Sequence, residues 1–452
     1  MNIEVPNGMT RRQFITAGAA ASAWLAMSKT GLAQAAAAAP PSDQVNVALV
    51  GCGDQGRVLV NACLKIPCVK FRAVCDIWPY AQRYGSRYLG KYGHETNVYA
   101  DYREMLEKEK GLDAIICASP DWMHSPITCA ALEAGKHVYC EKLMSNTVEG
   151  AKQMVLTQRK TGKLLQIGHQ RRSNPRYLHA KNKIIDEAHL LGRITHASGQ
   201  WHNVKKDDRT CAAKYELDEA TLKKFGYDDM HQLLNWRWFK KYGGGPICDL
   251  GAHQIDMFTW FLNANPKAVI ASGGIDYYKT HEWYDNVITV FEYDTKDGVA
   301  RSMYDVLTTT GSLGFLEKYM GIEGSMVISE MPRWNQVFRE KATAPEWTVW
   351  GEKGLVKRVE DTAAANAEEK KAAEVDVRLA ASPPPETWEI PVLLDKPPHQ
   401  PHLENFFEAI RKGAPLNCPA EVGYRSAVAV LKVNEAVVAQ KRLEFKPEEY
   451  RI

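Results

Sequence analysis

The sequence predicts an α/β protein in which a doubly wound parallel sheet is followed by an α+β domain with a largely antiparallel, open-faced sheet. Between residues 45 and 168, short apolar runs alternate with amphipathic helical stretches, which is typical of a parallel sheet with helices on both faces. Over residues 169–452, runs such as "NVITVFEYD" and "VARSMYDVL" alternate apolar and polar residues between turns. That alternation indicates antiparallel strands with one covered face.

Length and composition fit this organisation. The 452 residues suffice for two domains with substantial cores, and 45% hydrophobic with 25% charged residues is ordinary for a globular protein. The formal net charge is only +3, and no run of lysine and arginine is interleaved with aromatic residues. Nucleic acid is therefore excluded as an expected partner.

The first 35 residues are typical of an export signal. Arg11 and Arg12 precede an apolar, alanine-rich stretch that is too short for a permanent membrane span, and "AQA" at 33–35 suits a cleavage site. This segment resembles a twin-arginine signal peptide, and residues 36–44 follow it as a linker. We expect a periplasmic or secreted product that engages the twin-arginine machinery. The alternative is an unstructured tail with a chance arginine pair.

Ten cysteines are scattered through the chain without a Cys-x-x-Cys pair, many of them inside apolar runs such as "DAIICASP". This pattern indicates buried free thiols and neither a disulfide framework nor a zinc site. Free thiols agree with a protein that folds in the reducing cytosol before export. We expect no catalytic metal.

A glycine-rich turn follows the first apolar run. In "GCGDQG" the expected cofactor-binding residues are Gly51, Gly53, Gln55 and Gly56, and Asp76 ends the next strand 20 residues later. Glycines allow a pyrophosphate to approach the backbone, the following helix offers its N-terminus, and an acidic residue accepts hydrogen bonds from the ribose hydroxyls. A carboxylate there repels the 2′-phosphate of NADP, so the sequence favours NAD and a Rossmann domain. The alternative for Asp76 is a turn residue.

The segment "GGGPICDLGAHQID" (243–256) places two titratable side chains four positions apart. If Pro246 lies near a helix start, Asp249 and His253 project side by side and can handle a proton. The alternative is a capped helix in which Asp249 favours the positive N-terminus and His253 is a structural residue.

Several segments, taken together and in order, resemble the glucose-fructose oxidoreductase, inositol dehydrogenase and rhizopine catabolism (Gfo/Idh/MocA) family. They are "GCGDQG", "CASPDWMHSPITCAALEAGKHVYCEKLMSN", "IGHQRRSNP", "GGGPICDLGAHQID" and "AEVGYRSA". The resemblance runs from about residue 45 to 452. It implies a second domain that supplies the substrate site and an activity on sugars, cyclitols or their derivatives.

The resemblance also implies roles for individual residues. Glu141 and Lys142 match the family's Glu-Lys-Pro element, whose lysine reaches the nicotinamide and the reacting oxygen, with Leu143 where proline is usual. Asp249 and His253 match the family's catalytic pair. A histidine with a pKa near 6.5 can accept a hydroxyl proton at neutral pH, so we expect His253 to be the base, Lys142 to polarise the oxygen and Asp249 to position substrate or base.

Further residues are expected at the cofactor and substrate sites. Pro120 and His124 follow a buried strand and would border the nicotinamide, although His124 is equally consistent with a helix-start residue. A second set would bind substrate, with packing or a basic surface turn as the alternative: His169, Arg171, Arg172 and Trp238.

Three functional classes follow. The first is a nicotinamide-dependent oxidoreductase acting on a secondary hydroxyl of a sugar, glycoside or cyclitol. The second is a redox-assisted glycoside hydrolase or lyase whose NAD is retained and regenerated in each cycle. The third is a nucleotide-bound sensing protein without turnover, against which the intact set Lys142, Asp249 and His253 argues. We also expect a homo-oligomer formed through the open sheet.

Overall fold

The computed structural model of this chain describes residues 43–340, 343–359, 371, 374–375 and 385–452. The expected signal peptide (1–35) and nearly all of the linker (36–44) lie outside these residues. Residues 341–342, 360–370, 372–373 and 376–384 also lie outside them. In the part of the chain that the structure describes, no helix is long and apolar enough to cross a bilayer.

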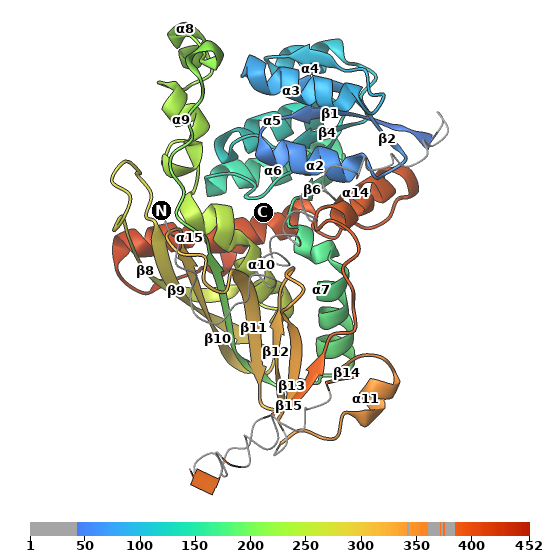
Figure 1. Ribbon diagram of the computed structural model, residues 1–452, viewed down its shortest axis with the longest axis vertical. Helices are drawn as coiled ribbons and strands as arrows, with labels where there is room; N and C mark the ends of the chain where they lie inside the picture. The colour runs from blue at the N-terminus through green and yellow to red at the C-terminus, as the bar shows by residue number, and fades with distance from the viewer. Residues whose placement is uncertain (1–42, 341–342, 360–370, 372–373, 376–384) are drawn as a thin grey trace, which may run out of the picture.

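The N-terminal sheet is parallel throughout and has the strand order β3-β2-β1-β4-β5-β6. Helices cover both of its faces (Figure 1). The strands are β1 (Val45–Val50), β2 (Val69–Cys75), β3 (Asn97–Tyr99), β4 (Ala114–Cys117), β5 (His137–Cys140) and β6 (Leu165–Ile167). The helices are α2 (Asp54–Cys63), α3 (Pro79–Gly90), α4 (Tyr102–Lys108), α5 (Asp121–Glu133) and α6 (Val148–Thr161). The predicted doubly wound sheet is confirmed, and its central strands are buried on both faces because helices cover them.

The second sheet has the order β14-β15-β13-β12-β11-β7-β10-β9-β8-β16, and its pairs are antiparallel except for β7 with β10. Its first strands are β7 (Ile194–His202), β8 (Pro266–Gly274), β9 (Asn286–Thr295), β10 (Gly298–Leu307) and β11 (Phe315–Gly321). The others are β12 (Gly324–Ile328), β13 (Asn335–Arg339), β14 (Lys357–Arg358), β15 (Glu386–Glu389) and β16 (Leu443–Glu444).

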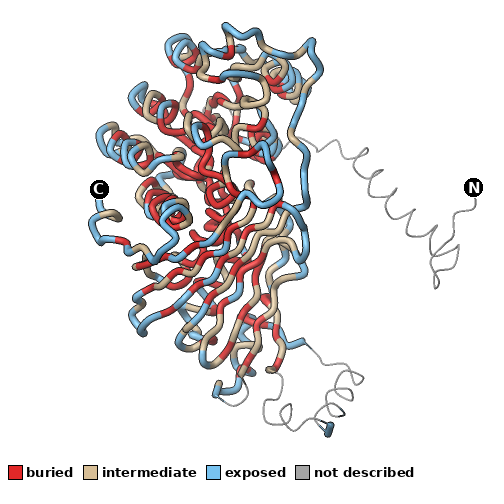
Figure 2. Tube along the Cα trace, turned by 90° about the vertical axis from the view of Figure 1, so that its left-hand side faces the viewer, coloured by how far each residue is buried: buried red, intermediate tan, exposed pale blue. Residues whose placement is uncertain are grey.

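Buried and partly exposed residues alternate along these strands (Figure 2). In β9, Phe291 and Tyr293 are fully buried whereas Ile288 is 52% exposed. One face is therefore packed and the other open, as the period of two in the sequence predicts.

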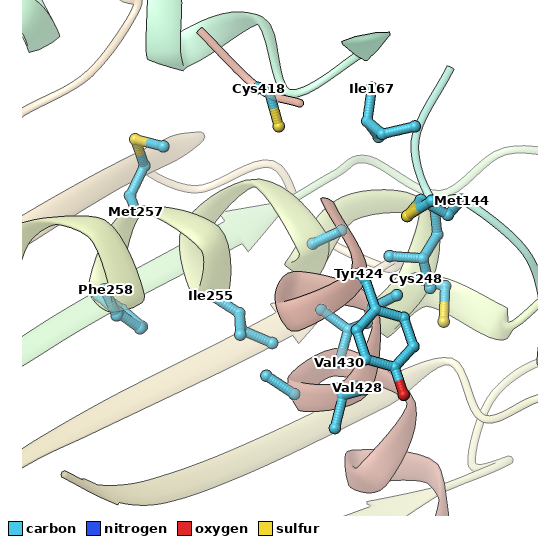
Figure 3. Packing of buried hydrophobic residues seen from close by; sticks show 14 of the residues in the cluster. Met144, Ile167, Cys248, Ile255, Met257, Phe258, Cys418, Tyr424, Val428 and Val430 are labelled. Atoms are coloured by element: carbon cyan, nitrogen blue, oxygen red, sulfur yellow. The ribbon is translucent and has the colours of Figure 1, made fainter. Parts of the chain in front are cut away.

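The long helix α15 (Ala420–Ala439) joins the two sheets. It packs against α6 and β6 of the first domain and against β8 and α10 (Ala252–Phe261) of the second. Figure 3 shows Tyr424 and Val428 of this helix among buried side chains that include Ile255 and Cys248. A neighbouring helix, α14 (Gln400–Lys412), packs against α2, β5 and the short helix η2 (Gln170–Ser173). The C-terminal segment thus fixes the domains relative to each other through a shared core.

Shorter helical segments complete the fold. They are η2 (Gln170–Ser173), α7 (Pro175–His179), η3 (Ala180–Glu187), η4 (Ala213–Tyr215), α8 (Glu219–Lys224), α9 (Met230–Leu234), η5 (Trp236–Trp238), η6 (Ile247–Gly251), α11 (Thr348–Glu352) and η7 (Pro447–Tyr450). In Figure 1, α8 and α9 rise from the second domain beside the first. All ten cysteines are unpaired, and eight of them are buried, which agrees with the predicted free thiols.

Candidate active site

A cavity of about 860 Å³ lies where the first sheet meets the second domain. The loops after β1, β2, β4 and β5 contribute its wall on one side, and residues between β7 and α10 contribute the other. Open α/β sheets bind their ligands at this edge, beyond the carboxyl ends of the strands. The volume is in the range of small-molecule and cofactor sites.

The glycine-rich turn at the start of α2 fits a pyrophosphate. Gly51 has φ +95°, and a Cβ at this position would lie 2.5 Å from the carbonyl oxygen of Ala118. A Cβ on Gly56 would lie 2.0 Å from the carbonyl oxygen of Gly51. Gly53, in contrast, lines the cavity and has open space where its Cβ would be. Two glycines therefore form the turn, and the third leaves room for a ligand against the N-terminus of α2.

Asp76 lies at the end of β2 and lines the same cavity. Its carboxylate accepts hydrogen bonds from the backbone N–H of Cys52 at 2.8 Å and of Trp78 at 2.9 Å. Burial raises the pKa of this carboxyl, and the two N–H donors oppose the rise. Since a carboxylate has further lone pairs, Asp76 fits a ribose diol while also holding the glycine-rich turn in place.

Gln55 connects that turn to the end of β5. Its side-chain amide donates to Glu141 Oε1 at 3.0 Å and lies 3.0 Å from Nε2 of His399. All three residues line the cavity. The expected cofactor residues Gln55 and Glu141 thus contact each other, and His399 joins them from the loop before α14.

Lys142 reaches across to the second domain. Its amino group donates a hydrogen bond to the backbone carbonyl of Asp249 and lies 3.8 Å from Oδ1 of the same residue. Arg237 Nε lies 3.0 Å from that carboxylate oxygen. Burial opposes ionisation of Asp249, but Arg237 and Lys142 outweigh it and hold the pKa of the carboxyl below its usual value. Asp249 is therefore charged and fixes two cations at the cavity.

His253 is buried beside an aromatic surface. Its ring stacks on Trp201 with centroids 5.2 Å apart, and Trp201 stacks on Phe315 at 4.4 Å. Burial and then the positive charge of Lys142 lower the pKa of His253 well below its ordinary value. Among the described residues neither ring nitrogen has a hydrogen-bond partner. The imidazole is therefore neutral and has a lone pair for a substrate proton.

The helix that carries Asp249 and His253 differs from the expected one. Pro246 does lie at its start, but residues Ile247–Gly251 form a π-helical turn before α10 begins. Asp249 pairs with Lys142 and Arg237, and no ion pair within 4.0 Å joins it to His253 in the described chain. Both side chains line the cavity.

Pro120 and His124 lie at the start of α5 and line the cavity. The ring nitrogens of His124 each lie 2.7 Å from a backbone carbonyl oxygen, of Leu143 and of Ser119. His124 also lies with Cys117 and Cys140 in a group whose potential ligand atoms are within 4.8 Å of one another. The ring of His124 therefore lies against the backbone of Leu143, next to Lys142, and of Ser119.

The four residues expected to bind substrate lie outside the wall of the cavity. Arg171 forms buried ion pairs with Glu317 and with Glu330, the latter at 3.1 Å, and Arg172 forms one with Asp256 at 2.7 Å. His169 is 1% exposed, and its Nδ1 is 3.7 Å from Asp256, which is too long for a hydrogen bond. These basic residues belong to a buried polar network between the domains and do not line the cavity.

Trp238 also differs from its expected place. It stacks on His281 with centroids 4.1 Å apart and is absent from the cavity wall. Its neighbours Trp236 and Arg237 face the cavity instead. The short η5 turn therefore directs consecutive side chains to different surroundings.

Several residues in the cavity wall were missed by sequence reasoning. They are Asp121, Gln170, Arg237, Phe315, Glu330 and His399. The signal for Arg237 was its position between two tryptophans, close to the glycines that precede Asp249. Glu330 and His399 follow no motif, and only the folded chain brings them to the site.

Profiles of two domains of one family match the chain consecutively. The profile described as "Oxidoreductase family, NAD-binding Rossmann fold" matches residues 45–169, and the "GFO/IDH/MocA C-terminal domain" matches residues 180–310. Together they cover more than half of the chain.

Individual proteins are similar over part of their length. The chain is 30% identical to inositol 2-dehydrogenase of Salmonella paratyphi B over 226 residues, which are 50% of this chain and 55% of that protein. It is 31% identical to a glycosyl hydrolase family 109 protein of Stenotrophomonas maltophilia over 162 residues, 34% of each chain. The chain thus spans about half the length of the curated relatives it matches first.

The fold is also that of a solved structure, a levoglucosan dehydrogenase in complex with NADH. The TM-score is 0.65 at 19% sequence identity, with 89% of this chain and 99% of that chain covered. With the glycine-rich turn, Asp76 and the Lys142–Asp249 arrangement, the two family profiles establish that this chain belongs to the Gfo/Idh/MocA oxidoreductase family with an NAD-binding Rossmann domain.

Proposed function

We propose that the protein oxidises or reduces a secondary hydroxyl position of a sugar, glycoside or cyclitol with a nicotinamide dinucleotide. The observation that carries this proposal is the position of Lys142, Asp249 and His253 in the same cavity as the glycine-rich turn and Asp76. The names of relatives, which include inositol 2-dehydrogenase and 1,5-anhydro-D-fructose reductase, support the substrate class.

Lys142, His253 and Asp249 each have a separate role in the proposed reaction. A bound nicotinamide supplies the hydride acceptor or donor. Lys142 is fixed by Asp249 and can hydrogen-bond the reacting oxygen, which stabilises negative charge as it develops. His253 takes the hydroxyl proton at a ring nitrogen, since this imidazole is neutral and unpartnered. Asp249 positions Lys142 and therefore acts on the reacting oxygen through that residue.

The cavity wall suits a carbohydrate ring. Trp201 and Phe315 present stacked aromatic faces beside His253, and such faces pack well against the C–H surface of a sugar. Gln170, Glu330 and Arg237 add polar groups that can bind hydroxyls. An aromatic surface combined with a few polar groups would fix both the position and the orientation of a bound sugar ring.

A second function, redox-assisted cleavage of a glycosidic bond, is supported by the similarity to a glycosyl hydrolase family 109 protein. Oxidation at one carbon would acidify the neighbouring C–H, elimination would release the aglycone, and the hydride would return from the same cofactor. Net oxidation leaves a keto product with NADH, whereas the redox-neutral route leaves neither.

Product analysis distinguishes the two functions. The purified protein is incubated with NAD and panels of cyclitols, free sugars and aryl glycosides, and the products are identified by mass spectrometry. Keto-sugar with an equal amount of NADH supports the oxidoreductase, and free aglycone without net NADH supports the lyase. If neither product nor NADH forms across the panel, the proposed function is wrong.

We propose NAD as the cofactor, because the carboxylate of Asp76 would repel the 2′-phosphate of NADP. We also propose that Arg11 and Arg12 direct export to the periplasm or beyond, with the cofactor carried inside the folded protein. Replacing both arginines by lysine should retain the protein in the cytoplasm, as cell fractionation would show. The exported protein, once denatured, should release close to one nicotinamide dinucleotide per chain.

We propose, finally, a homo-oligomer formed through the open face of the second sheet. Exposed apolar side chains on adjacent strands support this interface: Ile270 of β8, Ile288 of β9 and Met303 of β10. The double change Ile288→Lys with Met303→Lys should dissociate the oligomer in sedimentation experiments while leaving the fold intact. A wild-type monomer at micromolar concentration would refute the interface.

A further inference from the structure

The segment between β7 and η6, residues 203–245, extends from the second domain over the loops that form the dinucleotide site. We call this segment the clasp. We propose that the clasp completes the cofactor site from the second domain and sets the rate at which the dinucleotide leaves. The inference rests on the proposed function, because it needs a nicotinamide dinucleotide in the cavity.

The clasp contacts the loop after each of three Rossmann strands. After β1, Asp54 in the glycine-rich turn forms a 2.7 Å ion pair with Arg209. After β2, the indole N–H of Trp78 donates to the carbonyl of Tyr215 at 2.6 Å. After β4, the backbone N–H of Trp122 donates to the carbonyl of Tyr242 at 3.2 Å. The contacts therefore surround the place where the dinucleotide would lie.

An apolar cluster holds the centre of the clasp against the first domain. Leu222, Tyr227 and Tyr242 are buried in a cluster of their own, with Ile77 and Trp122 of the Rossmann domain packed against it. Trp122 lies edge-on to Tyr227 with centroids 5.9 Å apart. Burial of this surface between domains opposes opening of the clasp.

Gly226 packs closely against Trp122. It has φ +87°, and a Cβ there would lie 2.8 Å from the indole ring of Trp122. A side chain at this position would be strained and would push the clasp away from the ring. The close packing of clasp and Rossmann domain thus depends on this glycine.

The clasp also brings positive charge to the cavity. Arg209, Lys223, Lys224 and Arg237 all line it, and a dinucleotide carries two negative charges on its pyrophosphate. Arg237 forms a 3.0 Å ion pair with Asp249 through Nε, and its guanidinium group lies over the Trp236 ring, 4.3 Å from the ring centroid. Arg209 offsets the charge of Asp54, which would otherwise repel a pyrophosphate at the same turn.

Side-chain bonds of Asp208 and Asn235 hold the base of the clasp together. The carboxylate of Asp208 bonds His231 at 2.8 Å and His281 at 3.0 Å. Asn235 accepts from the backbone N–H of Arg209 at 2.8 Å and donates to its carbonyl at 3.0 Å. Arg209 is therefore held in place before it meets Asp54, and the clasp can move only as a unit or by breaking these bonds.

The experiment measures release of the cofactor and not turnover. The full-length protein is loaded with NADH, mixed with a large excess of NAD, and the loss of bound-NADH fluorescence gives the release rate. Arg209→Glu should speed release about three- to tenfold, because like charges replace an exposed ion pair. The matched control is Lys205→Glu, since Lys205 is a clasp residue whose contacts, with Asp207 and with the ring of Tyr277, all lie in the second domain.

A second pair of variants tests the apolar contact. Gly226→Ala should speed release about tenfold or more through strain and displacement from Trp122. Gly354→Ala imposes similar backbone strain at φ +70°, far from the clasp and with no atom within 4 Å of the new Cβ, and should leave release unchanged. Thermal melting of each variant confirms that it is folded.

The outcomes separate this inference from the proposed function. If both clasp variants release NADH at the rates of their controls, the clasp does not govern retention, although the cofactor assignment stands. If the unmodified protein binds neither NADH nor NADPH, the proposed function fails and the clasp inference falls with it. Protection of amides in 203–245 from hydrogen exchange on NADH binding would give independent support, and unchanged exchange would contradict the inference.

Discussion

The amino group of Lys142 lies 3.8 Å from Oδ1 of Asp249, although the two residues are 107 positions apart and belong to different domains. Arg237 reaches the same oxygen at 3.0 Å. A single carboxylate thus lies beside two cations, Lys142 and Arg237, in the wall of the cavity. This arrangement depends on the docking of the two domains, which α15 and α14 secure.

Lys142 and Asp249 should therefore act as a unit. Lys142→Met should lower kcat/KM by about 10²- to 10³-fold, the scale for loss of one donor to a developing oxyanion. Asp249→Asn should lower it less, and a double-mutant cycle should give a coupling energy of roughly 0.5–3 kcal/mol. Fluorescence titration should show nearly unchanged NADH binding. Strictly additive effects would mean that Asp249 does not work through Lys142.

His253→Ala should lower kcat by roughly 10²- to 10⁴-fold with cofactor affinity retained, because a base acts only in the transition state. Burial and Lys142 lower the pKa of His253, so the neutral form that accepts a proton persists as the pH falls below 6.5. The profile of kcat/KM against pH should therefore stay flat through pH 6.5 and decline only in more acidic solution. A midpoint at 6.5 or above would argue against His253 as the base.

Substitution of two glycines in the turn should affect protein stability and cofactor binding differently. Gly53→Ala should preserve the melting temperature, since the residue has φ −70° and open space around it, yet weaken NADH binding by crowding the pyrophosphate. Gly51→Ala should destabilise the domain itself, because the φ of +95° and the contact with Ala118 admit no side chain. Calorimetry and titration measure the two effects. Equal binding by Gly53→Ala and wild type would place the pyrophosphate elsewhere.

Asp76→Ala should weaken NAD binding by about 1–3 kcal/mol, the scale of a lost hydrogen bond to a charged group, and reduce discrimination against NADP. It should also lower stability, since the N–H groups of Cys52 and Trp78 lose their acceptor. Asp76→Asn keeps one oxygen acceptor and should be the milder change. A preference of the unmodified protein for NADP in parallel titrations would overturn the cofactor assignment.

Arg171 should matter for stability and not for substrate affinity. Arg171→Leu leaves Glu317 and Glu330 buried without their cation and should lower the free energy of unfolding by roughly 3–5 kcal/mol. Arg159→Leu, which removes a half-exposed ion pair with Glu421, should cost no more than about 1 kcal/mol. Urea denaturation gives both values. If Arg171→Leu changed KM and left the free energy of unfolding unchanged, Arg171 would be a substrate-binding residue.

The sequence pattern over a few neighbouring residues was enough to predict several secondary-structure elements and the glycine-rich turn. The apolar runs of β1 and β4, the glycine turn with Asp76, and the alternation in β9 each follow from spacing within a few residues. The residues Lys142, Asp249 and His253 were likewise visible as motifs, and all three line the cavity.

The identity of each element and of the motif residues could therefore be predicted, because period, turn chemistry and strand ends are local properties. The surroundings of the basic residues could not be predicted in this way. In the folded chain Arg171 and Arg172 form buried ion pairs with Glu317 and Asp256, whereas Arg237 faces the cavity and pairs with Asp249. The physical reason is that the surroundings of a charged side chain are made by distant segments.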